Sequence, residues 1–150
     1  MSKKNLASFA IVLIFILVSY HFFNSQGPSL RKIEYVKLAG VVIKVELAKT
    51  PAEQELGLSA RQDLAENEGM LFIFAESRQH PFWMKDMKFP IDIIWLNENM
   101  SIVYIKKDAR PESYPKIYSP DKDSKYVLEV VSGFAEKHAL KIGDKIEFIH

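Results

Sequence analysis

The chain has 150 residues, a length that favours one domain over two full hydrophobic cores. Lysine and arginine total 20 and aspartate and glutamate total 19, so the formal net charge is only +1, which argues against nucleic-acid binding through a basic face. The absence of cysteine excludes disulfides, a thiolate nucleophile and a cysteine-ligated zinc or iron–sulfur centre.

The first predicted element is an apolar membrane segment over residues 5–23. The 18 residues from Leu6 to Phe23 contain no charged side chain, and Lys3 and Lys4 precede them. A helix of this length spans roughly 27 Å, close to the ~30 Å of a bilayer core. Because the positive flank stays in the cytoplasm, we expect the rest of the chain to face the periplasm or the cell exterior. We favour an uncleaved anchor, and secretion after cleavage of a signal peptide is the alternative.

Residues 24–31 are polar and carry no apolar period, which predicts a linker ahead of a globular domain over residues 32–150. Over residues 33–38, Ile33, Tyr35 and Lys37 alternate with Glu34, Val36 and Leu38, and a second run rich in β-branched residues covers residues 41–47. These two runs flank an Ala-Gly pair, so the domain is expected to open with a β-hairpin.

A short helix is predicted over residues 51–56 by its end signals. Thr50 is suited to the N-cap, Pro51 to the first helical position and Glu53 to the far side of a capping box. Gly57 marks the exit.

The remaining segments read mainly as short strands bounded by turn residues. Strands are expected over residues 70–74, 82–87 (extended or bulged), 91–96, 100–106, 126–131 and 145–149. Three prolines place residues 108–125 in a long surface loop, and residues 134–140 are expected to form a second short helix. The predicted fold is a compact α+β domain, mainly antiparallel sheet or barrel-like, with two short helices behind one N-terminal transmembrane or signal helix.

Strand alternation singles out two carboxylates. Asp92 and Glu129 each share a strand face with apolar residues, where a carboxylate must be protonated or find hydrogen-bond donors. Arg61 and Lys85 are the expected donors. These four charges form either a structural ion network or a ligand-binding or catalytic site, and the pattern leaves both interpretations open.

Aromatic and methionine side chains can supply the walls of a pocket beside these charges, although ordinary core packing is the alternative for each. The candidates are Phe82, Trp83, Trp95, His80, Met70, Met84 and Met87. His80 lies in a polar loop and can titrate near neutral pH.

No motif for a metal or a cofactor is present. The histidines lack the spacings that place two imidazoles on one helix face, and Asp121 and Asp123 do not continue into a calcium loop. There is no nucleophile elbow, phosphate-binding loop or dinucleotide fingerprint either. We therefore expect neither a metal site nor a cofactor.

Three runs carry a family resemblance: 57–61 (Gly-Leu-Ser-Ala-Arg), 68–74 (Glu-Gly-Met-Leu-Phe-Ile-Phe) and 82–92 (Phe-Trp-Met-Lys-Asp-Met-Lys-Phe-Pro-Ile-Asp). Together with Tyr-Val-Leu-Glu-Val at 126–130 and the later glycines, they resemble the DUF192 family of uncharacterised bacterial and archaeal proteins over residues 41–149. The resemblance implies a small β-rich fold, often behind an export signal, and no established reaction.

The chain departs from the family pattern at Ser59, where methionine is usual, and at Asp86-Met87, where Asn-Thr is usual. Asp86 also changes the charge beside Lys85. The four charges singled out above all lie at positions that match the family motifs.

These observations predict a membrane-anchored, extracytoplasmic domain that binds a small polar ligand or an envelope protein in a charged, aromatic pocket. The candidate binding residues are Arg61, His80, Trp83, Lys85, Asp86, Asp92 and Glu129. One alternative is a hydrolase or lyase that uses Asp92 and Glu129 as an acid and base pair. Another is a non-catalytic accessory module that contacts another envelope protein through residues 108–125.

Overall fold

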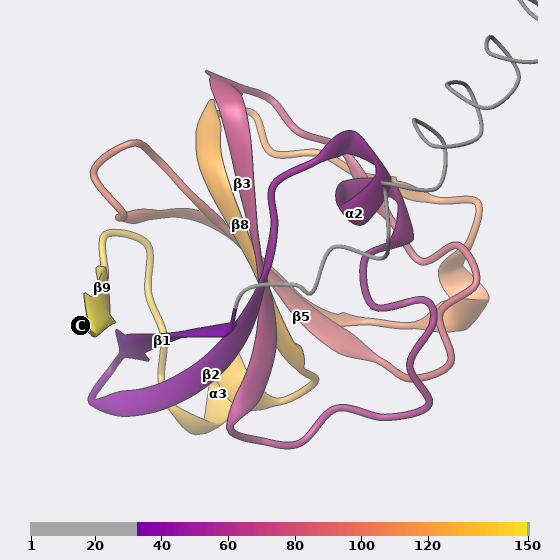
Figure 1. Cartoon of the computed structure of the whole chain (residues 1–150), viewed down its shortest axis with the longest axis horizontal. Coiled ribbons are helices and arrows are strands. Elements are labelled where there is room, and N and C mark those ends of the chain that lie inside the picture. Colours follow the sequence, from indigo (N-terminus) through magenta and orange to yellow (C-terminus); the bar gives the residue numbers. More distant parts are fainter. Residues whose placement is uncertain (1–32, 150) are drawn as a thin grey trace, which may run out of the picture. The chain divides into compact units, whose positions relative to one another are not determined.

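The computed structural model describes residues 33–149 (Figure 1). The predicted anchor over residues 5–23 and the linker over residues 24–31 lie outside this range, so both stay predictions. Within residues 33–149, no helix has the length and apolar character needed to cross a membrane.

The described part of the chain consists mainly of strands. The elements are β1 (Ile33–Leu38), β2 (Val41–Ala48), α2 (Pro51–Leu56), β3 (Glu68–Arg78), β4 (Phe82–Trp83), β5 (Ile91–Leu96), β6 (Ile102–Ala109), the 3₁₀ turn η1 (Pro111–Ser113), β7 (Ile117–Tyr118), β8 (Ser124–Val131), α3 (Phe134–Lys137) and β9 (Ile146–Ile149). This composition confirms a mainly β domain with two short α-helices.

Seven of these strands form one sheet in the order β6-β5-β8-β3-β2-β1-β9, while β4 and β7 pair separately (Figure 1). All neighbours are antiparallel except β2 and β3, which are parallel and are connected through α2. An isolated bridge between Ser101 and Lys145 joins segments next to the two edge strands. In the described residues β6 and β9 form no ladder with each other, so the sheet does not close into a barrel.

The local predictions at the start of the domain are confirmed. β1 and β2 form a hairpin, and α2 has the predicted capping box. Thr50 Oγ1 accepts from the Glu53 amide at 3.3 Å, and Glu53 Oε2 accepts from the Thr50 amide at 2.9 Å. Each interaction satisfies an amide that the first helical turn leaves without a partner.

Two segments differ from expectation. Only β4 of the predicted strand over residues 82–87 is extended, because the chain turns at once and Asp86 has a left-handed φ of 58°. The predicted loop over residues 108–125 contains η1 and also β7, which pairs with β4. This pairing joins short segments that are far apart in the sequence, so neither one signals a strand by itself.

Hydrophobic side chains cover both faces of the seven-stranded sheet. On one face, which we call the α3 face, Ile94 and Leu96 of β5 pack in a cluster with Phe134 of α3. On the other, the pocket face, Ile93 and Trp95 of β5 pack in a second cluster that contains Met84. Alternate residues of β5 therefore belong to different cores.

Candidate functional site

The two singled-out carboxylates lie on opposite faces of the sheet. In the β5–β8 register, Asp92 is directly opposite Val130, and Glu129 is directly opposite Ile93. Directly opposed residues of antiparallel strands project to the same face. Asp92 therefore lies on the α3 face and Glu129 on the pocket face.

Asp92 is fully buried and both of its carboxylate oxygens are occupied. Oδ1 accepts from the Asp108 amide and Oδ2 from the Ala135 amide, each at 2.8 Å. The second bond satisfies an amide in the first turn of α3. Asp92 thus joins β5, the end of β6 and α3. The predicted acid and base pair of Asp92 and Glu129 is wrong, because a sheet separates the two groups.

Glu129 is the opposite case. Its side chain is on β8, the residue is only 5% exposed, and Oε2 has no hydrogen-bond partner among residues 33–149. Burial raises the pKa of Glu129 from its ordinary value of 4.5 to about 8, because the charged form loses its hydration without gaining donors. The group is therefore mostly a neutral carboxylic acid at pH 7.

A glycine on the neighbouring strand β3 allows the backbone of β8 to approach closely. Gly69 of β3 is directly opposite Val130, and a Cβ at Gly69 would lie 2.7 Å from the Glu129 carbonyl oxygen. Any larger residue would have to move the two backbones apart. The Glu-Gly pair at the start of β3 thus helps to position the buried acid.

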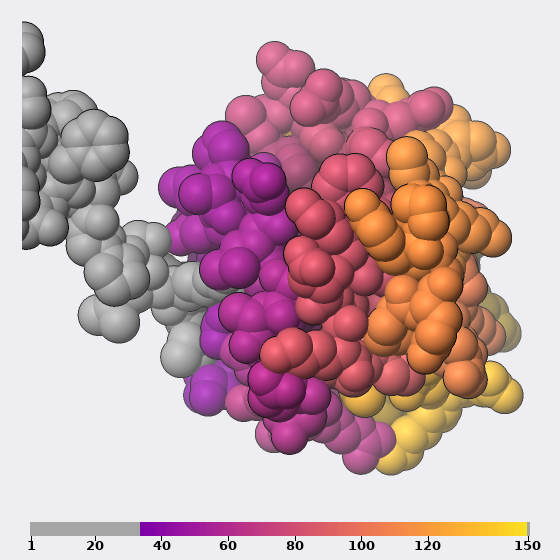
Figure 2. Space-filling model, turned by 90° about the vertical axis from the view of Figure 1, so that its right-hand side faces the viewer, coloured from indigo at the N-terminus to yellow at the C-terminus, as the bar shows by residue number. Residues whose placement is uncertain are grey.

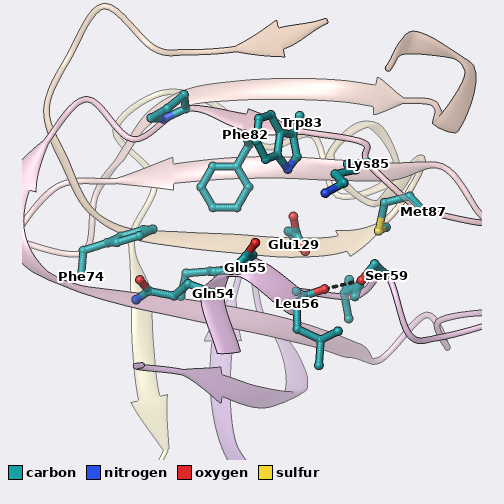
Figure 3. Close-up of a pocket in the computed structure, with 14 residues that line it drawn as sticks. Gln54, Glu55, Leu56, Ser59, Phe74, Phe82, Trp83, Lys85, Met87 and Glu129 are labelled. Atoms are coloured by element: carbon teal, nitrogen blue, oxygen red, sulfur yellow. Dashed lines mark hydrogen bonds between the residues drawn. The ribbon is translucent and has the colours of Figure 1, made fainter. Parts of the chain in front are cut away.

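Glu129 lines a pocket of about 390 Å³ on the pocket face. Aromatic residues supply one part of the wall, namely Phe72 and Phe74 of β3 with Phe82 and Trp83 of β4. The opposite wall comes from α2 and the residues after it, and Lys85 and Met87 complete the lining. The close-up shows Glu129 and Glu55 between Phe82 and Trp83 on one side and α2 on the other (Figure 3).

Figure 2 shows the side of the molecule on which α2, the residues after β4 and the loop over residues 108–125 lie side by side. A neighbouring hollow of about 450 Å³ shares Trp83, Lys85 and Glu55 with the pocket and adds Asp86. Trp83 is 50% exposed and makes an edge contact with Tyr114, with ring centroids 6.5 Å apart.

Two polar residues of the α2 wall donate their side-chain hydrogen bonds to backbone carbonyl oxygens of the protein. Gln54 Nε2 donates to the carbonyl oxygens of Ala48, at 3.3 Å, and Ile73, at 3.0 Å. Ser59 Oγ donates to the Leu56 carbonyl at 2.6 Å. The two Gln54 bonds connect α2 to the end of β2 and to the middle of β3.

Lys85 lines the pocket and is exposed. Among the described residues it has no ion-pair partner within 4.0 Å, and in the close-up it extends toward the hollow that contains Glu129 (Figure 3). Lys85 and Glu129 are thus the two predicted charges that share one pocket.

Arg61 does not contribute to the pocket lining. It pairs with Glu46 of β2 and, at 3.7 Å, with Glu68 at the start of β3. Its carboxylate partners are therefore neither of the two that strand alternation singled out, and Arg61 connects the loop after α2 to the parallel strand pair.

His80 lies behind the pocket wall. Its ring stacks on Phe74 with centroids 3.5 Å apart, and Nε2 lies 3.1 Å from the Glu76 carbonyl oxygen. Its own carbonyl accepts from Trp95 Nε1 at 2.9 Å. Burial lowers the pKa of His80 because the charged ring loses hydration. The residue supports Phe74 and does not itself line the pocket.

Of the predicted site, the structure brings together Phe82, Trp83, Lys85, Met87 and Glu129. Arg61, His80 and Asp92 lie elsewhere, as do Trp95, Met70 and Met84, which are core residues. The α2 wall was missed, although the capping box located the helix, because no pattern in its six residues indicates which neighbour it faces. Within residues 33–149, no group of three or more histidine, aspartate or glutamate side chains could hold a metal ion.

Two solved structures share the fold described above. A crystal structure of a candidate transcription regulator from Sinorhizobium meliloti 1021 superimposes with a TM-score of 0.76, is 32% identical, and covers 81% of this chain and 98% of its own. A protein of unknown function from Novosphingobium aromaticivorans DSM 12444 gives 0.74, also at 32% identity, covering 81% of this chain and 89% of its own. No curated protein matches the chain. The family model DUF192, described as an uncharacterised ACR family, matches residues 34–148, and the chain therefore belongs to the DUF192 family.

Proposed function

We propose that this chain is a membrane-anchored, extracytoplasmic binding protein whose pocket takes a small polar ligand. The ligand would lie between the aromatic wall of β3 and β4 and the α2 wall, with Glu129 at the inner end and Lys85 beside the entrance. An exposed indole such as that of Trp83 offers a flat apolar surface to a ligand that also needs polar contacts.

One observation carries this proposal, namely the buried Oε2 of Glu129 without a partner. Leaving a buried polar atom unsatisfied costs about 1–3 kcal/mol, so most proteins avoid it or use it. Here the unsatisfied atom belongs to a residue that lines a pocket, where a ligand can supply the missing hydrogen bond.

A thermal-shift screen of the full chain in mild detergent tests the proposal. The library should hold neutral, cationic and anionic metabolites together with cell-wall fragments, and a bound ligand raises the melting temperature by mass action. The variant Trp83→Ala should abolish the shift. Tyr35→Ala, which removes a comparably exposed aromatic residue on β1 outside the pocket lining, should keep it. Shifts that survive Trp83→Ala, or a screen with no shift, would contradict the proposal.

The membrane placement rests on the sequence of residues 5–23 and has its own test. Carbonate washing of membranes should leave the chain in the pellet, and protease added to intact spheroplasts should digest the domain. Recovery of the chain in the cytosolic fraction would contradict this part of the proposal and would leave the pocket unaffected.

A further inference from the structure

We infer that the ligand of this pocket carries a cationic nitrogen group, an ammonium or guanidinium on an apolar stem, and that Glu129 is the counter-ion that receives it. The inference rests on the proposed function and specifies the chemical class of the ligand.

The first argument is the balance of donors and acceptors around the pocket. Gln54 already uses Nε2 for two carbonyl oxygens, and Ser59 uses its hydroxyl proton for a third. What these side chains can still offer a ligand is oxygen lone pairs. Glu55 adds a carboxylate to the same lining. Apart from the Lys85 ammonium and the Trp83 indole N–H, the polar side chains of the lining offer a ligand acceptors, and a group with several N–H donors matches these acceptors.

The second argument is the position of the unpartnered oxygen. Glu129 is 95% buried by residue area, since only 5% is exposed, and Oε2 is the atom without a partner. An ionised carboxylate is stable in such surroundings only beside a positive charge. An ammonium group that enters the pocket supplies that charge and the hydrogen bond in one contact.

The third argument is the aromatic wall. Phe72, Phe74, Phe82 and Trp83 line the same hollow as Glu129. The faces of aromatic rings carry partial negative charge and attract cations. An apolar stem gains from the same surfaces through burial.

Lys85 is the one cationic side chain among the described residues that line the pocket. The competing possibility is that Lys85, and not a ligand, is the counter-ion of Glu129. If Lys85 were the internal counter-ion of Glu129, it would lie within ion-pair distance, and it does not. Its charge instead opposes a ligand cation, so removing that charge should tighten cation binding. A ligand anion would respond in the opposite direction.

Binding has a defined proton balance. At pH 7 the carboxylic acid of Glu129 is mostly protonated, because its pKa is raised to about 8. When an ammonium group binds, the O–H bond of the acid breaks, its proton passes to solvent, and an N–H···O contact forms. A pKa of about 8 corresponds to release of about 0.9 proton per bound cation at pH 7. Binding should also be about ninefold tighter at pH 7 than at pH 6.

Isothermal titration calorimetry of the full chain in detergent tests this with three probes of similar size, namely benzylamine, benzyl alcohol and benzoate. Repeating the titration in buffers of different ionisation enthalpy gives the number of protons released. We expect benzylamine to bind with release of about 0.9 proton, and the neutral and anionic probes to bind at least about tenfold more weakly.

Three variants locate the effect. Glu129→Gln should abolish proton release and weaken benzylamine binding by about tenfold or more. Lys85→Met should tighten benzylamine binding and weaken that of benzoate. Glu147→Gln, which removes an exposed carboxyl on β9, should change nothing. A melting curve of each variant confirms folding, and the pH dependence of the unaltered chain remains a test if Glu129→Gln does not fold.

Several results would overturn the inference. Stronger binding of benzyl alcohol or benzoate than of benzylamine would contradict a cationic ligand. Benzylamine binding that releases no proton, or that is unchanged in Glu129→Gln, would exclude Glu129 as the counter-ion. Weaker benzylamine binding in Lys85→Met would show that the charge of Lys85 does not oppose the ligand. In each of these cases a ligand still occupies the pocket, so the proposed function survives. Binding of none of the three probes would also overturn the inference, and the broader screen would then decide the proposed function separately.

Discussion

Replacing Asp92 should cost the domain much of its stability, because this carboxylate is a structural acceptor. It is fully buried and accepts two backbone amides at 2.8 Å, from Asp108 and Ala135. A hydrogen bond to a charged group contributes about 1.5–3 kcal/mol, and removing its acceptor leaves a buried donor unsatisfied. Asp92→Ala should therefore lower the free energy of unfolding by about 3–6 kcal/mol, a large part of the 5–15 kcal/mol typical of a domain.

Asp92→Asn separates the two bonds. One oxygen remains to accept one amide, while the new NH₂ group faces the other donor, so we expect a loss of about 2–3 kcal/mol. A suitable control is Asp144→Ala, whose carboxylate accepts the Lys141 amide at 2.8 Å near the surface, and a loss of about 1 kcal/mol is expected there.

Urea unfolding followed by far-ultraviolet circular dichroism measures all three variants. A loss of about 1 kcal/mol or less in Asp92→Ala would refute the structural role. Loss of ligand binding without loss of stability would do the same, because Asp92 would then be acting on a ligand.

Three further changes have expected outcomes. Glu129 has a folded-state pKa of about 8 against an ordinary 4.5, so its contribution to stability is fully present below about pH 4.5 and is lost as pH rises through about 8. In urea unfolding, the free energy of unfolding of the unaltered chain should fall by up to about 3.5 kcal/mol between pH 5 and 8 relative to that of Glu129→Gln. Parallel pH profiles of the two proteins would contradict this. The pKa of His80 is lowered, so its contribution to stability is present above about pH 6.5 and is lost on acidification. The variant His80→Gln should therefore show a smaller fall in melting temperature between pH 7 and pH 5 than the unaltered chain. An equal fall in both proteins would count against burial of a neutral ring. Thr50→Ala should cost about 1 kcal/mol through the capping box while Thr50→Ser costs little, and equal losses would show that the cap is not responsible.

Local signals predicted the elements whose causes are local. The capping box of Thr50 and Glu53 is complete within one turn, so its residues alone specify the start of α2. The hairpin of β1 and β2 likewise depends on alternation and a two-residue turn, in which Ala39 and Gly40 both take positive φ.

The candidate site was predicted only in part because register is not local. Alternation correctly placed Asp92 and Glu129 among apolar neighbours, but only the pairing of β5 with β8 decides which sheet face each one occupies. The same limitation applies to Arg61, whose partner Glu46 lies on a strand that alternation could not connect to it. Lys85 and Trp83 were found because the turn after β4 keeps them close in both sequence and space.

The most direct test of the account follows the carboxyl carbon of Glu129 itself. Carbon-13 NMR of the chain labelled at the glutamate side-chain carboxyl groups, titrated from pH 4 to pH 10, should show one resonance with a midpoint near 8 that is absent in Glu129→Gln. Benzylamine should shift that midpoint downward, because a bound cation favours the ionised form. If every glutamate resonance finishes its titration below pH 6, or if benzylamine leaves the midpoint unchanged, Glu129 is not a buried, unpaired acid that awaits a cationic ligand.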